Sequence, residues 1–367
     1  MDLAHDQAQD MLRASARDFL EKECPATLVR ALEKTDRGYS PDLWRKMADL
    51  GWVGLGLPSR YGGGDGTIID QVVLMEEIGR ALLPSPILSS SVRCGQLILN
   101  AGSDAQKQKW LPIMASGQAV FAVAYAEAGI TMSTPITTTI KHDGKGYVAN
   151  GSKFTVPFGA SVDYMIIGAQ GEKGLTFSIV ESKAPGITVK PLKSVANDPR
   201  CQVFFKNVKV SADNVIASGI EPFRRMLDYA ALCGCGEMLG RAQKILELVV
   251  DYGKTRVQFG RPIGAFQAVQ HQCADLRVAI DAASLLVYNA AAAMLEGRPC
   301  VEEVSLAKAK CNEMSRYSTF VGHGIFAGYS YTVEHDMQLY SSRNKLAESS
   351  MGNSTYHLGR VADQMGL

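Results

Sequence analysis

Arg256 and Gln267, eleven positions apart, are the residues of this chain whose types and spacing most strongly indicate ligand chemistry. They lie in the segment RVQFGRPIGAFQAVQ, residues 256–270. Gly260 indicates the end of one helix and Ala265 the approximate start of the next. A guanidinium offers planar, paired donors to phosphate oxygens, and an amide adds a further hydrogen-bonding group. The segment therefore predicts contact with a phosphate-bearing cofactor.

This segment resembles the fingerprint of the acyl-CoA dehydrogenase family, in which the arginine and the glutamine hold the ADP end of FAD bound on the neighbouring subunit. The resemblance implies these roles for Arg256 and Gln267, and a packing contact between Phe259 and the cofactor. Taken alone, the segment is also compatible with an ordinary helix corner that carries a solvated arginine. Further matches follow in the family's order: GWVGLGLPSRYGG (51–63), EEIGRA (76–81), KQKWLP (107–112), VSADNVI (210–216) and TVEHDMQLY (332–340).

The adenine side of the same half-site departs from the family. The family's Gln-x-x-Gly-Gly-x-Gly loop falls on residues 324–330, where only Gly328 survives well. The resemblance assigns Gly328 to the cofactor site, with an adenine contact that is weaker or made differently.

Two motifs that face the flavin ring in the family are also altered. The family's Thr-Glu-Pro corresponds to Ala-Glu-Ala at residues 126–128, and its Trp-x-Thr corresponds to residues 155–157, so that a threonine has become Pro157. Proline offers neither a hydroxyl nor an amide hydrogen. Backbone groups of Ala126 and Glu127 remain available, but we expect no flavin ring to be bound by these residues.

The family's catalytic glutamate, which removes the α-proton of the acyl-CoA, has no counterpart. Its two positions in the family fall on Gly352 and Ala230. Asp228 and Glu348 are the nearest substitutes. Asp228 lies about 200° around a helix from Ala230, and Glu348 lies about one turn before Gly352, so neither points naturally at the same site. We expect no catalytic base in this chain, and paired or solvated carboxylates at the two substitutes.

Other candidate groups favour structural roles. His323 and His335 titrate near neutral pH, but they lie in a glycine-rich loop and at a helix start, without a partner at useful spacing. Asp65 and Asp70 fit loop and cap chemistry. No cluster of His, Cys, Asp or Glu has metal-ligand spacing, so we expect no metal.

Composition limits the classes of partner. The chain has 367 residues, of which 46% are hydrophobic and 20% charged, with a formal net charge of +1. This charge gives no electrostatic case for nucleic acid or anionic lipid. Apolar runs fall short of the roughly 18 residues that span a bilayer, and the N-terminus lacks a signal core, so we expect a cytoplasmic protein without a membrane segment. The eight cysteines favour buried free thiols.

The helical and strand patterns along the sequence predict an α+β fold in three parts. Residues 1–117 read as an all-helical domain, residues 118–212 as an antiparallel β-barrel or sandwich, and residues 213–367 as a helical bundle of four helices. Turn signals divide the middle part: Asp143-Gly144, Asn150-Gly151 and Pro185-Gly186.

Single helices carry their own signals. Ser40 and Pro41 predict a helix start, and Gly51 the matching end. An apolar stripe at spacings of three and four predicts a helix after the fingerprint: Phe266, Val269, Cys273, Leu276 and Ile280.

The chain combines residues for the ADP end of FAD with altered flavin-ring motifs and no catalytic base. This combination predicts an FAD site that is shared between two different subunits. This combination resembles the heteromeric α2β2 acyl-CoA dehydrogenases of bacterial steroid and cholesterol side-chain degradation. The leading hypothesis is a base-lacking subunit that supplies the ADP half of an FAD site, while a related subunit supplies the ring contacts and the glutamate. An acyl-CoA substrate and electron-transfer flavoprotein as electron acceptor are implied. The alternatives are a homo-oligomeric dehydrogenase with a displaced base, a flavin-free scaffold and a flavin monooxygenase.

Overall fold

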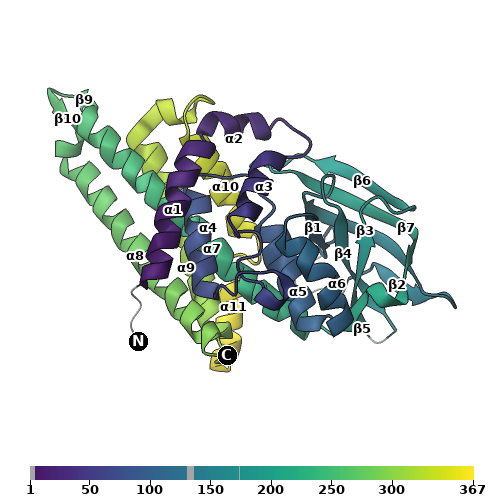
Figure 1. Ribbon diagram of the computed structural model, residues 1–367. Coiled ribbons are helices and arrows are strands. Elements are labelled where there is room, and N and C mark those ends of the chain that lie inside the picture. The colour runs from purple at the N-terminus through teal and green to yellow at the C-terminus, as the bar shows by residue number, and fades with distance from the viewer. Residues whose placement is uncertain (1–4, 130–135, 173) are drawn as a thin grey trace. The chain divides into compact units, whose positions relative to one another are not determined.

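The computed structural model of the protein describes residues 5–129, 136–172 and 174–367. Within these residues the chain contains long helices and one large sheet, which confirms the predicted α+β class (Figure 1). No cis peptide bond occurs in the described part.

The chain forms two compact units, each assembled from segments that are distant in sequence. Unit 1 takes residues 5–29, 67–83 and 231–367, and unit 2 takes residues 30–66 and 84–230. The units therefore differ from the three predicted segments, because two helices of the N-terminal third belong to the same unit as the C-terminal helices. The predicted segment boundaries remain sequence predictions.

Unit 1 is helical. Its C-terminal part holds three long helices and two shorter ones, rather than the four predicted. The elements of the unit are α1 (Gln7–Glu23), α4 (Ile68–Arg80), most of α7 (Glu221–Thr255), β9 (Val257–Gln258), β10 (Arg261–Pro262), η4 (Ile263–Ala265), α8 (Gln267–Leu295), α9 (Val301–Phe326), η5 (Ala327–Tyr331), α10 (Met337–Ser349) and α11 (Ser354–Met365). The short α2 (Ala26–Leu32) begins in unit 1 and ends in unit 2.

Buried ion pairs attach α1 to α4. Arg13 Nη2 donates to Glu76 Oε2 at 2.9 Å, and Arg17 donates to both carboxylate oxygens of Glu77. Tyr288 Oη of α8 donates to Glu76 Oε1 at 2.7 Å. Both glutamates are almost fully buried, and burial raises the pKa of Glu76. Because a buried carboxylate needs a partner, α1 is required to satisfy the charged face of α4.

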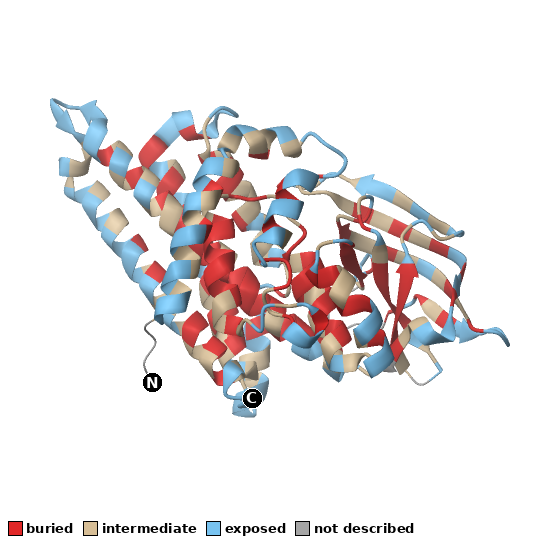
Figure 2. Cartoon of the chain, in the orientation of Figure 1, coloured by how far each residue is buried: buried red, intermediate tan, exposed pale blue. Residues whose placement is uncertain are grey.

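Glycines bring α4 and α7 into backbone contact. A Cβ added at Gly240 would lie 1.8 Å from the Glu76 carbonyl oxygen, and one at Gly79 would lie 2.1 Å from the Glu237 carbonyl oxygen. Only glycine permits this approach. The densest burial of unit 1 follows α4 and the part of α7 that it contacts (Figure 2).

One described helix, α8, has the length and apolar composition of a membrane span, with 39% of its most apolar window buried. It is more apolar than the sequence analysis expected. A core helix of a soluble protein passes the same test, and α8 packs against α9 and α4 inside unit 1. Exposed apolar side chains remain on its other face, among them Val278 and Leu285.

Unit 2 contains short helices and the sheet. The helices are α3 (Pro41–Asp49), η1 (Ser59–Tyr61), η2 (Leu88–Cys94), α5 (Gly95–Ala101), α6 (Asp104–Ala115), η3 (Ala212–Asn214) and the first turns of α7. The Ser40 hydroxyl accepts a hydrogen bond from the Leu43 amide at the start of α3, and Gly51 has a φ of +78° after its end. Both features are as predicted.

The sheet has eight strands in the order β6-β7-β3-β2-β4-β5-β8, with β1 on β4. Most pairs are antiparallel, but β1 and β2 both pair parallel with β4, which the sequence did not indicate. The strands are β1 (Phe121–Ala124), β2 (Thr139–His142), β3 (Tyr147–Pro157), β4 (Tyr164–Gly171), β5 (Gly174–Glu181), β6 (Ile187–Leu192), β7 (Arg200–Val210) and β8 (Val215–Ser218).

The predicted turn at Asn150-Gly151 is wrong, because both residues lie inside β3. They form a bulge against β7, where Asn150 Oδ1 accepts a hydrogen bond from the Asn207 amide at 2.8 Å. Gly151 is required because a Cβ there would lie 2.6 Å from Thr138 Oγ1. A bulge and a turn select the same residue types, so the sequence does not distinguish them.

Candidate functional site

The chain between α7 and α8 forms a hairpin, which corrects the predicted helix junction. α7 ends at Thr255, and β9 pairs antiparallel with β10 (Figure 1). The two loop residues, Phe259 and Gly260, have φ values of +54° and +78°. Positive φ at both loop positions is what a tight two-residue hairpin requires. Gly260 therefore closes a hairpin and does not end a helix.

The hairpin presents the predicted cofactor residues to solvent. Arg256, Phe259 and Gln267 are all exposed, and Phe259 is 91% exposed. The backbone beneath them is fixed, because the Ile263 amide donates to the Arg256 carbonyl at 2.8 Å. Within the described residues the Arg256 side chain makes no hydrogen bond or ion pair. The Phe259 ring contacts Phe266 edge-on, with centroids 6.2 Å apart, and the described part of the chain leaves the Arg256 side chain free to bind a ligand.

The loop of residues 324–330, at the family's adenine position, keeps a backbone conformation that favours glycine although its sequence has changed. Ala327, where the family motif has glycine, has φ +54° and ψ −144°. L-residues adopt this combination only with strain. The Ser330 hydroxyl donates to the Ala327 carbonyl at 2.7 Å and stabilises the path, and Gly328 is exposed beside it. The predicted cofactor residue Gly328 thus belongs to a strained, solvent-facing loop of unit 1.

We expect Ala327→Gly to stabilise the protein by about 1 kcal/mol, because relief of the strain exceeds the added flexibility of the unfolded chain. Urea unfolding measures the change. Ala274→Gly, at an exposed position inside α8, is the control and should destabilise by a similar amount. If both substitutions changed the unfolding free energy equally, the backbone of Ala327 would not be strained.

The two histidines near this loop have structural contacts. His323 Nδ1 lies 2.9 Å from Ser330 Oγ, and its ring stacks on Tyr331 with centroids 4.5 Å apart. The His335 ring packs against Phe326 at 4.4 Å. Burial lowers the pKa of His323, so it is neutral at physiological pH. His323 lies inside α9 and has Ser330 as a partner, which corrects its predicted position in a glycine-rich loop. The contacts of both residues are structural.

In unit 2 the first ring-facing motif is held by a buried ion pair. Glu127 Oε1 accepts from Lys153 Nζ at 2.7 Å, and the carboxylate also accepts from the Thr137 and Thr138 amides at 2.7 and 2.9 Å. Burial alone would raise the pKa of Glu127, but these hydrogen bonds hold it at about 2. The glutamate therefore anchors residues 126–128, and its carboxylate is fully occupied.

The second ring-facing motif lies at a bulge of β3. The register between β3 and β7 shifts between Lys153 and Val156, and Thr155 inside the shift has φ +55°. Pro157 pairs with Arg200 and contributes no donor. The Phe154 amide donates to the Ala126 carbonyl at 2.7 Å, so that carbonyl is also occupied. The side chains of residues 126–128 and of Pro157 therefore offer no hydrogen-bond donor to the polar edge of a flavin ring.

The two base positions carry no ionisable group. Ala230 is fully buried in α7. Gly352 has φ +100°, and a Cβ there would lie 2.4 Å from Tyr356 Cδ1 and 2.6 Å from His357 Nε2. The preceding residue, Met351, has no ionisable group either. The loop around Gly352 therefore excludes a carboxylate at that position unless its backbone is rebuilt.

A buried lysine that the sequence analysis did not identify fixes this loop. Lys308 of α9 is fully buried, and its ammonium donates to Asn312 Oδ1 at 2.5 Å, to the Ala347 carbonyl at 3.1 Å and to the Gly352 carbonyl at 3.3 Å. Three acceptors match the three donors of an ammonium. Lys308 thus closes the C-terminal end of α10 and holds the loop around Gly352.

His357 makes the stability of this region depend on pH. Burial lowers its pKa to about 4, and Nε2 lies 2.9 Å from the Met351 carbonyl. As pH falls from about 6.5 towards 4, the unfolded chain takes up a proton that the folded chain does not, so stability is lost over this range. Between pH 7 and pH 4.5 we expect a loss of about 2 kcal/mol that His357→Gln removes. Unfolding free energies at pH 7 and pH 4.5 test this, and an equal pH dependence in both proteins would contradict it.

The two substitute carboxylates are not free bases. Glu348 forms ion pairs with Lys345 at 3.1 Å and Arg316 at 3.6 Å. Asp228 is buried, at 8% exposure, rather than solvated. The ion pairs of Glu348 agree with the predicted paired carboxylate, whereas the burial of Asp228 corrects its predicted surface position. That neither replaces the missing glutamate stays a prediction.

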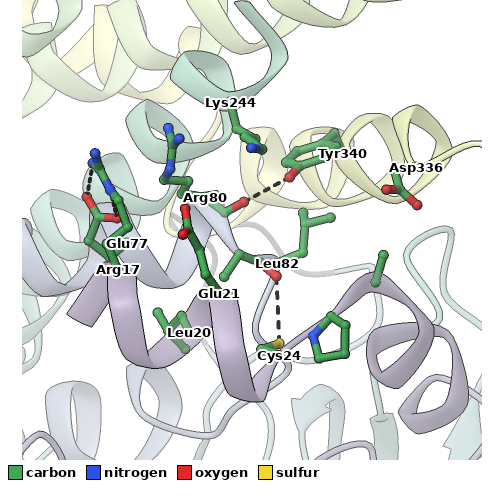
Figure 3. Close-up of a pocket in the computed structure, with 13 residues that line it drawn as sticks. Arg17, Leu20, Glu21, Cys24, Glu77, Arg80, Leu82, Lys244, Asp336 and Tyr340 are labelled. Carbon is green, nitrogen blue, oxygen red and sulfur yellow. Dashed lines mark hydrogen bonds and ion pairs between the residues drawn. The ribbon is translucent and has the colours of Figure 1, made fainter. Parts of the chain in front are cut away.

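A pocket of about 280 Å³ in unit 1 lies away from these residues (Figure 3). Two interactions join residues of its lining: Arg17 binds Glu77, and the Tyr340 hydroxyl donates to the Arg80 carbonyl at 2.8 Å (Figure 3). Burial raises the pKa of the lining Cys24 to about 11, so the thiol is protonated. The predicted cofactor residues are not among those that line the pocket.

All eight cysteines are free thiols, as predicted, and six of them are buried. Within residues 5–129, 136–172 and 174–367, His, Cys, Asp and Glu form no group of three that could hold a metal ion.

Comparison with known proteins assigns the chain to three consecutive domain families. Residues 6–118 match the N-terminal domain of acyl-CoA dehydrogenase, residues 120–208 its middle domain and residues 217–366 its C-terminal domain.

Individual relatives span almost the whole chain. An acyl-CoA dehydrogenase of Bacillus subtilis is 33% identical over 90% of this chain and 91% of its own length. The structure of butyryl-CoA dehydrogenase from Megasphaera elsdenii is 27% identical, with a TM-score of 0.92 over 100% of both chains. A variant of the Tcur3481–Tcur3483 steroid ACAD is 26% identical, with a TM-score of 0.90 over 98% of both chains.

Proposed function

Because this chain belongs to the acyl-CoA dehydrogenase family, we propose that it is the base-lacking subunit of a heteromeric acyl-CoA dehydrogenase. The family's members are FAD-dependent oxidoreductases that act on the CH–CH group of an acyl-CoA, so the predicted enzyme class and cofactor are confirmed. The heteromeric role is the finer proposal. The observation that carries it is the contrast between an exposed ADP half-site and ring positions at which residues 126–128 and Pro157 offer no side-chain donor.

The ADP half of the FAD site fits the residues present. Arg256 can pair with pyrophosphate oxygens, Gln267 can add an amide contact, and Phe259 can cover an apolar part of the cofactor. All three side chains face solvent in the single chain. We infer that they act on an FAD whose ring lies on another subunit.

The ring half and the base must come from that subunit. Pro157 and the alanines of residues 126–128 supply no side-chain donor, and the Glu127 carboxylate is held by its own ion pair. Both base positions lack a carboxylate. When bound, FAD supplies the hydride acceptor. This chain's own contribution is to bind and orient the ADP part of the cofactor.

The relatives support a partner of the same family. The Tcur3481–Tcur3483 steroid ACAD is named for two proteins, and it shares the fold of this chain along its whole length. We propose a related acyl-CoA dehydrogenase subunit as partner, in a heterotetramer, with an acyl-CoA as substrate. Electron-transfer flavoprotein as the acceptor and a cytoplasmic location remain proposals that follow from the sequence analysis.

A homo-oligomeric dehydrogenase with a displaced base is the main alternative. Glu348→Gln and Asp228→Asn test it in the isolated chain, with acyl-CoA oxidation followed by reduction of an artificial electron acceptor. We expect no activity in the unaltered chain alone, and therefore no effect of either change. Activity of the isolated chain that either substitution abolishes would overturn the heteromeric proposal.

A further inference from the structure

Arg93, in unit 2, is a cation to which the described part of the chain offers neither a hydrogen bond nor an ion pair. Its Nε is inaccessible to solvent and has no acceptor. The residue as a whole keeps some accessible surface, so that a ligand can reach it. A partly buried guanidinium without an acceptor destabilises a fold. Sites that lower stability in this way are frequently ligand sites.

The backbone holds Arg93 in an irregular helix. η2 contains a π-turn, in which the Val92 amide donates to the Ile87 carbonyl at 3.1 Å. The Ser90 hydroxyl accepts from the Phe121 amide of β1 at 3.0 Å. π-turns interrupt regular helices at a cost in stability and occur often at functional sites. The position of Arg93 is therefore fixed by the fold.

The electrostatic surroundings leave one positive charge uncompensated. Burial lowers the pKa of Arg93, and nearby Arg200 acts in the same direction. Arg200 is itself neutralised by Asp198, with Nε and Oδ2 2.6 Å apart. It also lies opposite Pro157 in the register of β7 and β3. The free charge of Arg93 thus lies near the strands that carry residues 155–157.

We propose that Arg93 is the anchor of a binding site for a carboxylate. One uncompensated charge matches one carboxylate, which a guanidinium binds through two parallel hydrogen bonds. A phosphate dianion requires further cations, and Arg200 is already paired. The carboxylate can belong to the acyl group of a CoA thioester or to a free dicarboxylic acid. This site does not depend on which subunit holds the flavin ring.

Calorimetric titration of the purified protein, in the oligomer in which it is isolated, tests the site. The probes are succinyl-, glutaryl- and adipoyl-CoA, each against butyryl-, valeryl- or hexanoyl-CoA of equal carbon number, together with free glutarate. We expect at least one diacid thioester to bind about tenfold or more tightly than the uncharged thioester of equal carbon number, or free glutarate to bind measurably. Binding of glutarate alone would identify a free dicarboxylate as the ligand, and binding of only the thioesters would identify an acyl-CoA.

Substitutions assign the preference to the arginine. Arg93→Gln should remove the preference for the acid, Arg93→Lys should keep part of it, and Arg45→Gln, at an exposed arginine of the same unit, should leave it unchanged. Without ligand, Arg93→Gln should melt no lower than the unaltered protein, because it removes a charge that lacks a partner. No preference for any acid, a preference that survives Arg93→Gln, or a lower melting temperature of that variant would each overturn the proposal.

Discussion

Arg256→Ala, introduced into the assembled oligomer, is expected to release FAD. The arginine is exposed, its backbone is fixed by the hairpin, and its side chain is unused within the described part of the chain. Removing a guanidinium from a phosphate contact costs about 2 kcal/mol or more, which corresponds to at least about 30-fold weaker binding. Flavin absorbance of the gel-filtered protein, before and after dilution, measures the loss.

The control for this change is Arg298→Ala, which removes the same charge at a site that pairs with Glu296 between α8 and α9. It should leave flavin content unchanged. If Arg256→Ala also retained all its FAD, the fold would serve as a flavin-free scaffold or bind the cofactor elsewhere, and the assignment of the ADP half-site would fail.

Gly240→Ala is expected to have the largest effect on stability. The added methyl would lie 1.8 Å from the Glu76 carbonyl oxygen and 2.9 Å from the Arg80 amide nitrogen. Both atoms belong to the backbone of α4, so the two helices must separate. That separation also disturbs the buried pair of Glu76 with Arg13. We expect a loss of about 4 kcal/mol or more, or failure to fold.

Gly359→Ala provides the matched control, because this helical glycine of α11 has open space around its Cα. It should be neutral or stabilise by up to about 1 kcal/mol. Thermal unfolding of both variants separates close packing from helix propensity. A small effect at Gly240 would show that α4 and α7 can separate without loss, contrary to the geometry.

The sequence predicted those features that depend on local chemistry. The cap at Ser40, the glycine after α3, the free thiols and the absence of a carboxylate at both base positions follow from residue type alone. The buried end of the apolar stripe, Leu276 and Ile280, also lies where its spacing predicted.

The sequence did not reveal features that depend on pairing between distant segments. Gly260 and Gly151 are turn-forming residues in any context, and only the partner strand decides between a helix end, a hairpin and a bulge. The grouping of α1 and α4 with the C-terminal helices rests on Arg13 and Arg17, which resemble surface arginines in sequence.

Two cations were also missed, the fully buried Lys308 and the partly buried Arg93. Lys308 lies in the sequence Leu-Ala-Lys-Ala-Lys. In this sequence it differs from the half-buried Lys310 only by its place on the buried stripe of α9. Arg93 lies in a segment whose π-turn has no sequence signature. Both residues can be recognised only in the folded structure, because the burial of a charge depends on how distant segments pack.

The most direct test of the shared site is the FAD content of this chain expressed alone and together with the acyl-CoA dehydrogenase encoded beside it. Visible absorbance after denaturation gives the number of flavins per chain. We predict no bound FAD in the isolated chain and about one FAD per pair of chains in the co-expressed oligomer, since each site then takes its ADP half from this subunit. One FAD per chain in the isolated protein would contradict the account, because residues 126–128 and Pro157 would then hold a flavin ring without a partner.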